Sequence, residues 1–328
     1  MIAITGATGL LGSFIASKFI LEGEQVVGIK REKSNISVVD HLQDKIQWRV
    51  ADVADSISLS ESFQGIHTVI HSAALVSFNP RKAKEIFDTN VIGTKNVVDA
   101  CLASGVRKLI HISSVAALGR ERGVQLISEE NTWADSQLNS DYAISKYQAE
   151  LEVFRGHEEG LHVSLVNPSV ILAPANWNRS SSQLFKYIWN EKPFYTEGML
   201  NYVDVRDVAT IIHLLYKGDF NGERFIVNAN HVSFKTIFDE IARRFNKKSP
   251  SIKVNPSLTG IVAWFEAIRC LLTNQEPIIT KHTAHMAREP IHYDNKKALT
   301  KLKIQFHSLD ETLDFCCKYY AQENTTNK

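Results

Sequence analysis

The sequence has few cysteines, almost no excess of charge of either sign and no long apolar run. Its four cysteines form no CxxC pair, so we expect reduced, buried thiols such as Cys316 and Cys317 in a cytoplasmic protein. The 37 basic and 36 acidic residues give a net charge of +1, which argues against nucleic acid or a membrane as a partner. The most apolar stretch, residues 258–272, is too short to span a bilayer, and residues 1–5 suggest a strand rather than a secretory signal.

Short apolar runs alternate with helical patterns through the first half of the chain. Runs that are apolar throughout are typical of parallel strands covered on both faces. The candidate strands are residues 2–5, 25–29, 46–50, 68–71, 108–112 and 162–166. The candidate helices between them are residues 10–21, 83–103 and 142–155. We therefore predict an α/β protein with a Rossmann-type, doubly wound parallel sheet.

A glycine loop joins the first strand to the first helix. The strand runs into Gly6-Ala-Thr-Gly9-Leu-Leu-Gly12, and a helical pattern begins at Leu10. Small residues let the backbone approach a pyrophosphate, and a helix N-terminus directs N–H groups and a positive dipole end at it. The order of strand, glycines and helix predicts a dinucleotide site. The alternative is an ordinary tight turn.

Two positions after later strands bear on the choice of cofactor. An NAD site usually has an acid at the end of the second strand, where this chain has Lys30 and Arg31. Because arginine can pair with a 2′-phosphate, we predict NADP, with NAD possible. The alternative is that both are solvated loop charges. Asp52, after the third strand, could bind the adenine amino group or cap a turn.

Tyr142 and Lys146 lie four residues apart at the start of a helical pattern and so share one face. An ammonium beside a phenol lowers its pKa, and we expect Tyr142 to exchange a proton with a carbonyl or alcohol. The alternative is a surface tyrosine packed on a lysine stem. Ser113 and Ser114 follow the strand 108–112, at the edge where Rossmann-type sites assemble, and a hydroxyl there could bind the substrate oxygen. Alternatively, the serines only end the strand.

These residues resemble the extended short-chain dehydrogenases/reductases, which include the NAD(P)-dependent epimerase/dehydratases and dihydroflavonol-reductase-like enzymes. The resemblance covers most of the chain. Its motifs are Thr5-Gly-Ala-Thr-Gly-Leu-Leu-Gly12, Ala51-Asp-Val53, His71-Ser-Ala-Ala74, Asn90-Val-Ile-Gly-Thr94, Ile112-Ser-Ser114, Tyr142-Ala-Ile-Ser-Lys146, Asn167-Pro-Ser-Val170 and Val203-Asp-Val-Arg-Asp-Val-Ala209.

The resemblance implies a role for each matching position. The phosphates would be bound by Gly6, Thr8, Gly9, Leu10, Leu11 and Gly12. The adenine, ribose and nicotinamide would be contacted by Asp52, Val53, Ala73, Ala74, Pro168, Ser169 and Val170. Ser114, rather than Ser113, would be the catalytic hydroxyl beside Tyr142, and Lys146 would also hold the nicotinamide ribose. Asn90 would brace the backbone near His71 rather than touch substrate.

The chain also departs from branches of this family. Nucleotide-sugar members often carry an arginine just before the proline of Asn167-Pro168, and an Arg-Asp pair where this chain has Leu200-Asn201. The missing arginines count against a nucleotide sugar. Dehydratases commonly have a Thr-Asp-Glu set, and Ser113-Ser114-Val115 does not supply the acids.

Together these observations predict an NAD(P)-dependent oxidoreductase that reduces a small, fairly apolar carbonyl or oxidises the corresponding alcohol. The alternatives are an NAD-dependent nucleotide-sugar epimerase/dehydratase and a non-catalytic dinucleotide sensor. We expect a dinucleotide-binding domain of residues 1–170, to which 201–229 return, and a mostly helical substrate-binding cap of residues 171–200 and 230–328. The family resemblance implies a homodimer or monomer. His282 and His285 stand three apart without a third ligand, so we expect no metal.

Overall fold

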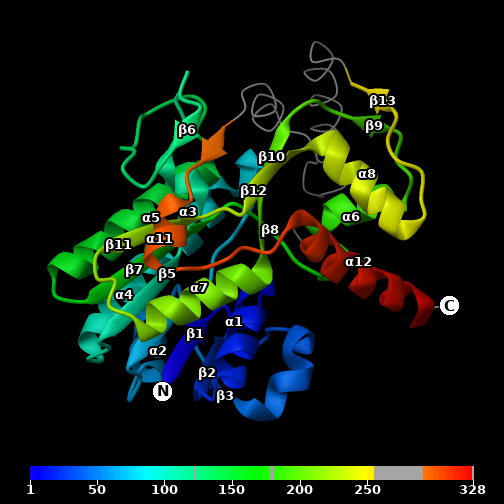
Figure 1. Cartoon of the computed structure of the whole chain (residues 1–328). Helices are drawn as coiled ribbons and strands as arrows, with labels where there is room; N and C mark the ends of the chain where they lie inside the picture. The colour runs from blue at the N-terminus through cyan, green and yellow to red at the C-terminus, as the bar shows by residue number, and fades with distance from the viewer. Residues whose placement is uncertain (122, 178–180, 255–290, 327–328) are drawn as a thin grey trace.

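The computed structural model describes residues 1–121, 123–177, 181–254 and 291–326 (Figure 1). The apolar stretch 258–272, Cys270, His282 and His285 lie outside the described residues, as does much of the predicted cap segment 230–328. No described helix has the length and apolar character that crossing a membrane requires.

A seven-stranded parallel sheet forms the centre of the molecule, as the sequence predicts (Figure 1). Its spatial order is β11-β7-β5-β4-β1-β2-β3. The strands are β1 (Ile2–Thr5), β2 (Val26–Lys30), β3 (Ile46–Val50), β4 (Thr68–His71), β5 (Lys108–Ile112), β7 (His162–Pro168) and β11 (Glu223–Val227). The order reverses between β1 and β4, and ligands of such sheets bind outside the carboxyl ends of the strands at this switch point.

Alternate residues of the inner strands face two separate cores. Ile2 and Ile4 pack with α1 (Leu10–Leu21) and α7 (Val205–Lys217) on one face. Ala3 packs on the other face, in the core that also buries residues of α2 (Ser56–Ser62), α4 (Gly93–Ala103) and α5 (Asp141–Glu158). Burial on both faces explains why the strands are apolar at successive positions rather than at every second one.

The predicted helix 83–103 is interrupted. It consists of α3 (Ala83–Phe87), the π-helical turn η3 (Asp88–Ile92) and α4. A π-turn inserts one extra residue and rotates the side chains that follow. Asn90, within this turn, is buried. The short 3-10 elements are η1 (Ser37–Lys45), η2 (Pro80–Lys82) and η4 (Val115–Leu118).

A third core lies beyond the sheet, built mainly by residues after β7. It contains the small sheet β12-β10-β8 (Asn230–Ser233, Met199–Asp204, Val170–Leu172) and helices α6 (Ser182–Trp189), α8 (Phe234–Phe245) and α12 (Leu309–Thr326). Phe185 is fully buried there against Tyr320, with ring centroids 5.1 Å apart. Cys316 and Cys317 are buried and free, as expected. The remaining elements are β6 (Leu126–Ile127), β9 (Phe194–Tyr195), β13 (Ile252–Lys253), β14 (His292–Tyr293) and α11 (Lys296–Lys301).

Candidate active site

Ser114 and Tyr142 meet at the carboxyl edge of the sheet. Tyr142 is in the first turn of α5, whose N-cap Ser140 accepts a hydrogen bond from the Ala143 amide at 3.2 Å. Ser114 follows β5 and caps η4, where its hydroxyl accepts from the Ala116 amide at 3.2 Å. The Ser114 side chain lies close enough to Tyr142 to lower the pKa of its phenol. The structure therefore joins a strand end and a helix start that are far apart in sequence.

Lys146 lies one turn after Tyr142 and is 2% exposed. Its Nζ donates to the Ile112 carbonyl at 2.7 Å and lies 3.5 Å from Nε2 of His111. Burial lowers the pKa of Lys146 to about 8, and the nearby Glu150 carboxylate opposes that shift. A buried lysine with a lowered pKa is typical of functional sites.

The direction of the Tyr142 pKa shift differs from the sequence-based expectation. Burial raises the pKa of Tyr142, and the nearby Ser114 side chain only partly offsets this. The physical reason is that burial penalises the phenolate, while the Lys146 ammonium is directed to the Ile112 carbonyl. Phe78 adds an apolar neighbour, with its ring edge-to-face with Tyr142 at 5.7 Å. Tyr142 is therefore held as a phenol, the form that can donate a proton.

His71 connects the glycine loop to α4 and is not placed as a proton carrier. Its Nδ1 lies 2.7 Å from Oγ1 of Thr5, and its Nε2 lies 3.0 Å from Oγ1 of Thr94. Burial, together with the charge of Lys146, lowers the pKa of His71 to about 3. A ring that is neutral and bonded at both nitrogens is structural.

Asn90 braces the backbone, as the resemblance implies, but at Leu75 rather than directly at His71. Its Oδ1 accepts from the Leu75 amide at 2.8 Å, and its Nδ2 donates to the Leu75 carbonyl at 3.0 Å. Nδ2 also lies 3.0 Å from Oγ of Ser145, on α5. Thr94 donates to the Asn90 carbonyl at 2.6 Å and so links this brace to His71.

The glycine loop is closed by contacts that only glycine permits. Gly6 has φ of +70°, and a β-carbon there would lie 2.8 Å from the Ala73 backbone. A β-carbon on Gly12 would lie 2.1 Å from the Gly6 oxygen. Gly9 is the N-cap of α1 and donates its amide to Gly6 at 2.8 Å. The first N–H groups of α1, at Leu10 and Leu11, have no partner within the helix and suit an anion.

The other predicted cofactor residues lie along the same edge. Arg31 is exposed directly after β2. Oδ1 of Asp52 accepts from the Ala54 amide at 3.0 Å, so Asp52 caps a turn, which is the alternative that the sequence left open. The Val53 carbonyl accepts from Asn96 at 2.9 Å. The Ser169 hydroxyl, between β7 and β8, is buried without a partner among the described residues, which leaves a donor for a bound molecule.

Three residues that the sequence reasoning left without a catalytic role lie behind this cluster. Asn167 donates to the Ser114 carbonyl at 2.9 Å and to Oε1 of Glu150 at 2.6 Å. Glu150 in turn pairs with Arg224 at 3.2 Å. The spacing of four between Lys146 and Glu150 is a signal that could have pointed to Glu150, because it places both on one helix face.

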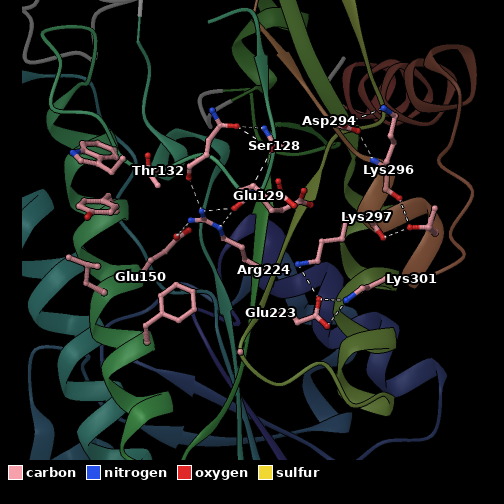
Figure 2. A pocket seen from close by; sticks show the side chains of 18 residues that line it. Ser128, Glu129, Thr132, Glu150, Glu223, Arg224, Asp294, Lys296, Lys297 and Lys301 are labelled. Carbon is pink, nitrogen blue, oxygen red and sulfur yellow. Dashed lines mark hydrogen bonds and ion pairs between the residues drawn. The ribbon is translucent and has the colours of Figure 1, made fainter.

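A cavity of about 1040 Å³ lies on the outer side of Glu150, between α5, β11 and α11 (Figure 2). Its wall includes Arg224, Lys297 and Lys301, and the last two pair with Glu223. Tyr142, Ser114 and the glycine loop are not among the described residues that line it. Its size does not make it the reaction site, because the groups that can move a proton are elsewhere.

Comparison with known proteins agrees with this geometry. The chain is 28% identical to a putative dihydroflavonol 4-reductase from Synechocystis sp. over 320 residues, 94% of this chain and 91% of the relative. It is 29% identical to cinnamoyl-CoA reductase 1 of Oryza sativa over 232 residues, 66% and 68% of the two chains. The crystal structure of gox2253 matches with a TM-score of 0.84 and 27% identity, over 98% of both chains.

A model of the NAD dependent epimerase/dehydratase family matches residues 2–228. The matched range contains the glycine loop, Ser114, Tyr142 and Lys146, and it ends just after β11 of the central sheet. Three observations indicate the same family: the fold, the position of these groups at one edge of the sheet, and the family match. The chain belongs to the NAD dependent epimerase/dehydratase family and is an NAD(P)-dependent oxidoreductase of the extended short-chain dehydrogenase type.

Proposed function

We propose that this enzyme is an NADP-preferring reductase that interconverts a small, fairly apolar carbonyl compound and its alcohol. The observation that carries the proposal is the placement of Ser114 beside Tyr142, with buried Lys146 one turn away. The printed names of two relatives, a dihydroflavonol 4-reductase and a cinnamoyl-CoA reductase, support a reductase. The neutral residues at Leu200-Asn201 count against a nucleotide-sugar diphosphate.

The residues divide the chemistry between them. The dinucleotide supplies the hydride when bound. Ser114 would donate a hydrogen bond to the substrate carbonyl oxygen, and Tyr142 would give that oxygen its proton as the carbon accepts the hydride. Lys146, held against Ile112, would place positive charge near the phenolate that Tyr142 becomes. In the reverse direction Tyr142 would remove the proton from the alcohol.

The cofactor would lie along the carboxyl edge of the sheet. The glycine loop with Thr8, Leu10 and Leu11 would bind the diphosphate, and Arg31 the 2′-phosphate. The remaining contacts would come from Asp52, Val53, Ala73, Ala74, Tyr142, Lys146, Pro168, Ser169 and Val170. The Ser169 hydroxyl, which is buried without a partner among the described residues, fits a group bound at this edge.

The proposed domains correspond to the residues that would bind the dinucleotide and those that would bind the substrate. Residues 1–170 and 201–229 would bind the dinucleotide, and residues 171–200 and 230–328 would form the cap that selects the substrate. The third core, whose described part includes Phe185 and Tyr320, supports a separately packed cap. The substrate would be a small molecule, and the enzyme a homodimer or monomer.

Fluorescence titration with NADPH and NADH, followed by a carbonyl screen, tests the proposal. We expect NADPH to bind more tightly, and Arg31→Asp to remove that preference while NADH binding persists. Lys33→Asp, on the same exposed loop, is the matched control and should keep most of it. Stoichiometric NAD retained through purification would instead favour the epimerase reading, and failure to bind either dinucleotide would refute the proposal.

A further inference from the structure

Glu150 is a buried carboxylate one turn beyond Lys146 on α5. It is 1% exposed, yet both of its oxygens have partners. Oε1 accepts from Asn167 Nδ2 at 2.6 Å, and Oε2 lies 3.2 Å from Arg224 Nη1. A buried carboxylate is costly unless it is paired and hydrogen-bonded, and Glu150 has an ion-pair partner and a hydrogen-bond donor.

Arg224 anchors the outer end of this arrangement in the cavity wall (Figure 2). Besides Glu150, its guanidinium donates to the Glu129 carbonyl at 2.7 and 3.0 Å and to the Asn131 carbonyl at 3.0 Å. These bonds fix the planar fork in one orientation, so that Nη1 faces Glu150. The Glu150 carboxylate therefore has a fixed counter-charge on the side away from the site.

Asn167 carries the arrangement inward to Ser114. The residue is fully buried at the end of β7, and its Nδ2 donates both to Glu150 and to the Ser114 carbonyl at 2.9 Å. Turning the amide over would bring Oδ1 against these two acceptor oxygens. Glu150 thereby determines which way Asn167 points, and Asn167 holds the backbone from which the Ser114 hydroxyl projects toward Tyr142.

Glu150 also faces the catalytic lysine. The titratable groups around Lys146 are His111 on β5, His71 on β4, and Tyr142 and Glu150 on its own helix. Burial lowers the pKa of both histidines well below its usual value, so both rings are neutral. Burial lowers the pKa of Lys146 as well, and Glu150 is the group that raises it. Glu150 therefore favours the ammonium form of Lys146.

We propose that Glu150 is a positioning residue with two effects: through Asn167 it holds the Ser114 backbone, and by its charge it keeps Lys146 cationic. Arg224 is its anchor. The inference rests on the proposed function, because it assigns a purpose to Ser114 and Lys146 as that function uses them. It assigns a role to three residues, Glu150, Asn167 and Arg224, that lie behind the proposed catalytic side chains.

Glu150→Gln tests both effects, with Glu152→Gln as the matched control. Glu152 is on the same helix and pairs with Arg155 at the surface. NADPH affinity is measured from pH 6 to 10 by fluorescence, and kcat with a carbonyl that the wild type reduces. In Glu150→Gln we expect kcat to fall by about 10- to 100-fold. The pH at which NADPH binding weakens should be lower in Glu150→Gln than in the wild type, because Glu150 raises the pKa of Lys146. Glu152→Gln should match the wild type.

Two further variants separate the effects. Asn167→Ala should lower kcat while the pH dependence of NADPH binding stays as in the wild type. Glu150→Asp keeps the carboxylate but shortens the side chain, so it should also lower kcat without changing the pH dependence of NADPH binding. This variant replaces Glu150→Gln if Glu150→Gln does not fold. Wild-type kcat in both Asn167→Ala and Glu150→Asp, or a Glu150→Gln that matches Glu152→Gln, would overturn the inference alone. A wild type that binds no dinucleotide would overturn the proposed function and the inference with it.

Discussion

Gly12 and Gly6 approach so closely that a β-carbon on Gly12 would lie 2.1 Å from the Gly6 carbonyl oxygen. This contact closes the loop between β1 and α1 and presents the N-terminus of α1 at the sheet edge. The first prediction follows from it, because a methyl group there must push the loop open.

Gly12→Ala should lower the free energy of unfolding by about 2–3 kcal/mol through overpacking and should weaken dinucleotide binding. Gly23→Ala is the control: φ is +80° there but nothing lies within 4 Å of the added carbon. Backbone strain alone should cost this variant about 1–2 kcal/mol and leave binding intact. Urea unfolding and fluorescence titration give both quantities. Equal binding by the two variants would contradict the assignment of the loop.

Tyr142→Phe should reduce turnover by about 10²- to 10⁴-fold, the usual contribution of a general acid, because it removes the proton donor but keeps the ring. The dissociation constant for NADPH should change by less than about threefold, equivalent to under 0.7 kcal/mol. Tyr147→Phe, on the same helix but stacked on Trp133 at 4.3 Å, should keep wild-type turnover. The assay follows NADPH absorbance during carbonyl reduction. Wild-type-like turnover by Tyr142→Phe would remove the mechanism.

His71 should make stability depend on pH in the acid range. Its pKa in the folded state is about 3, against 6.5 for an ordinary histidine. Between these values the unfolded chain binds a proton that the folded chain does not, so stability falls as pH falls from 6.5 toward 3.

The histidine's share of that dependence is measurable with His71→Asn. One proton corresponds to about 1.4 kcal/mol per pH unit, and the slope of unfolding free energy between pH 6 and 4 should be shallower by that amount in the variant. Only the slope is compared, since the substitution also changes stability at neutral pH. Parallel slopes would show that His71 protonates in the folded protein.

Asn90→Ala should destabilise the protein by about 2–3 kcal/mol and lower kcat. The change removes the Asn90 partners of the Leu75 amide and carbonyl and the bond from Asn90 to the Ser145 hydroxyl on α5. Asn96→Ala, which removes one bond to the Val53 carbonyl from a half-buried side chain, should cost about 1 kcal/mol and leave kcat unchanged. Denaturant unfolding and steady-state kinetics separate the two outcomes. Equal effects of the two variants on kcat would contradict the role of Asn90.

The sequence was sufficient for the sheet and for most of the cluster at its edge. Continuous apolar runs predicted buried parallel strands, and the structure confirms all of the candidate strands within two residues at either end. The spacing of four in Tyr142 and Lys146 required them to share one face of a helix. Local rules sufficed here because period and spacing are properties of neighbours along the chain.

The sequence was insufficient where a property depends on burial or on distant partners. The predicted direction of the Tyr142 pKa shift was wrong, because burial of the phenol has a larger effect on its pKa than its polar neighbours have. The sequence predicted one long helix, but a π-helical turn around Asn90 interrupts it. This turn lets the Asn90 side chain bind both Leu75 and Ser145. Neither the burial of a side chain nor a π-helical turn produces a repeating pattern in the sequence.

The sequence by itself determined that this chain forms a parallel sheet with a glycine loop at one end and a Tyr142–Lys146 pair on one helix. Only the tertiary structure decided what surrounds that pair. Glu150, Asn167 and Arg224 come from α5, β7 and β11, and they meet because β5, β7 and β11 are neighbours in the sheet. Hydrogen bonds and desolvation act through space, so the charge of Lys146 and the position of Ser114 follow from the packed fold.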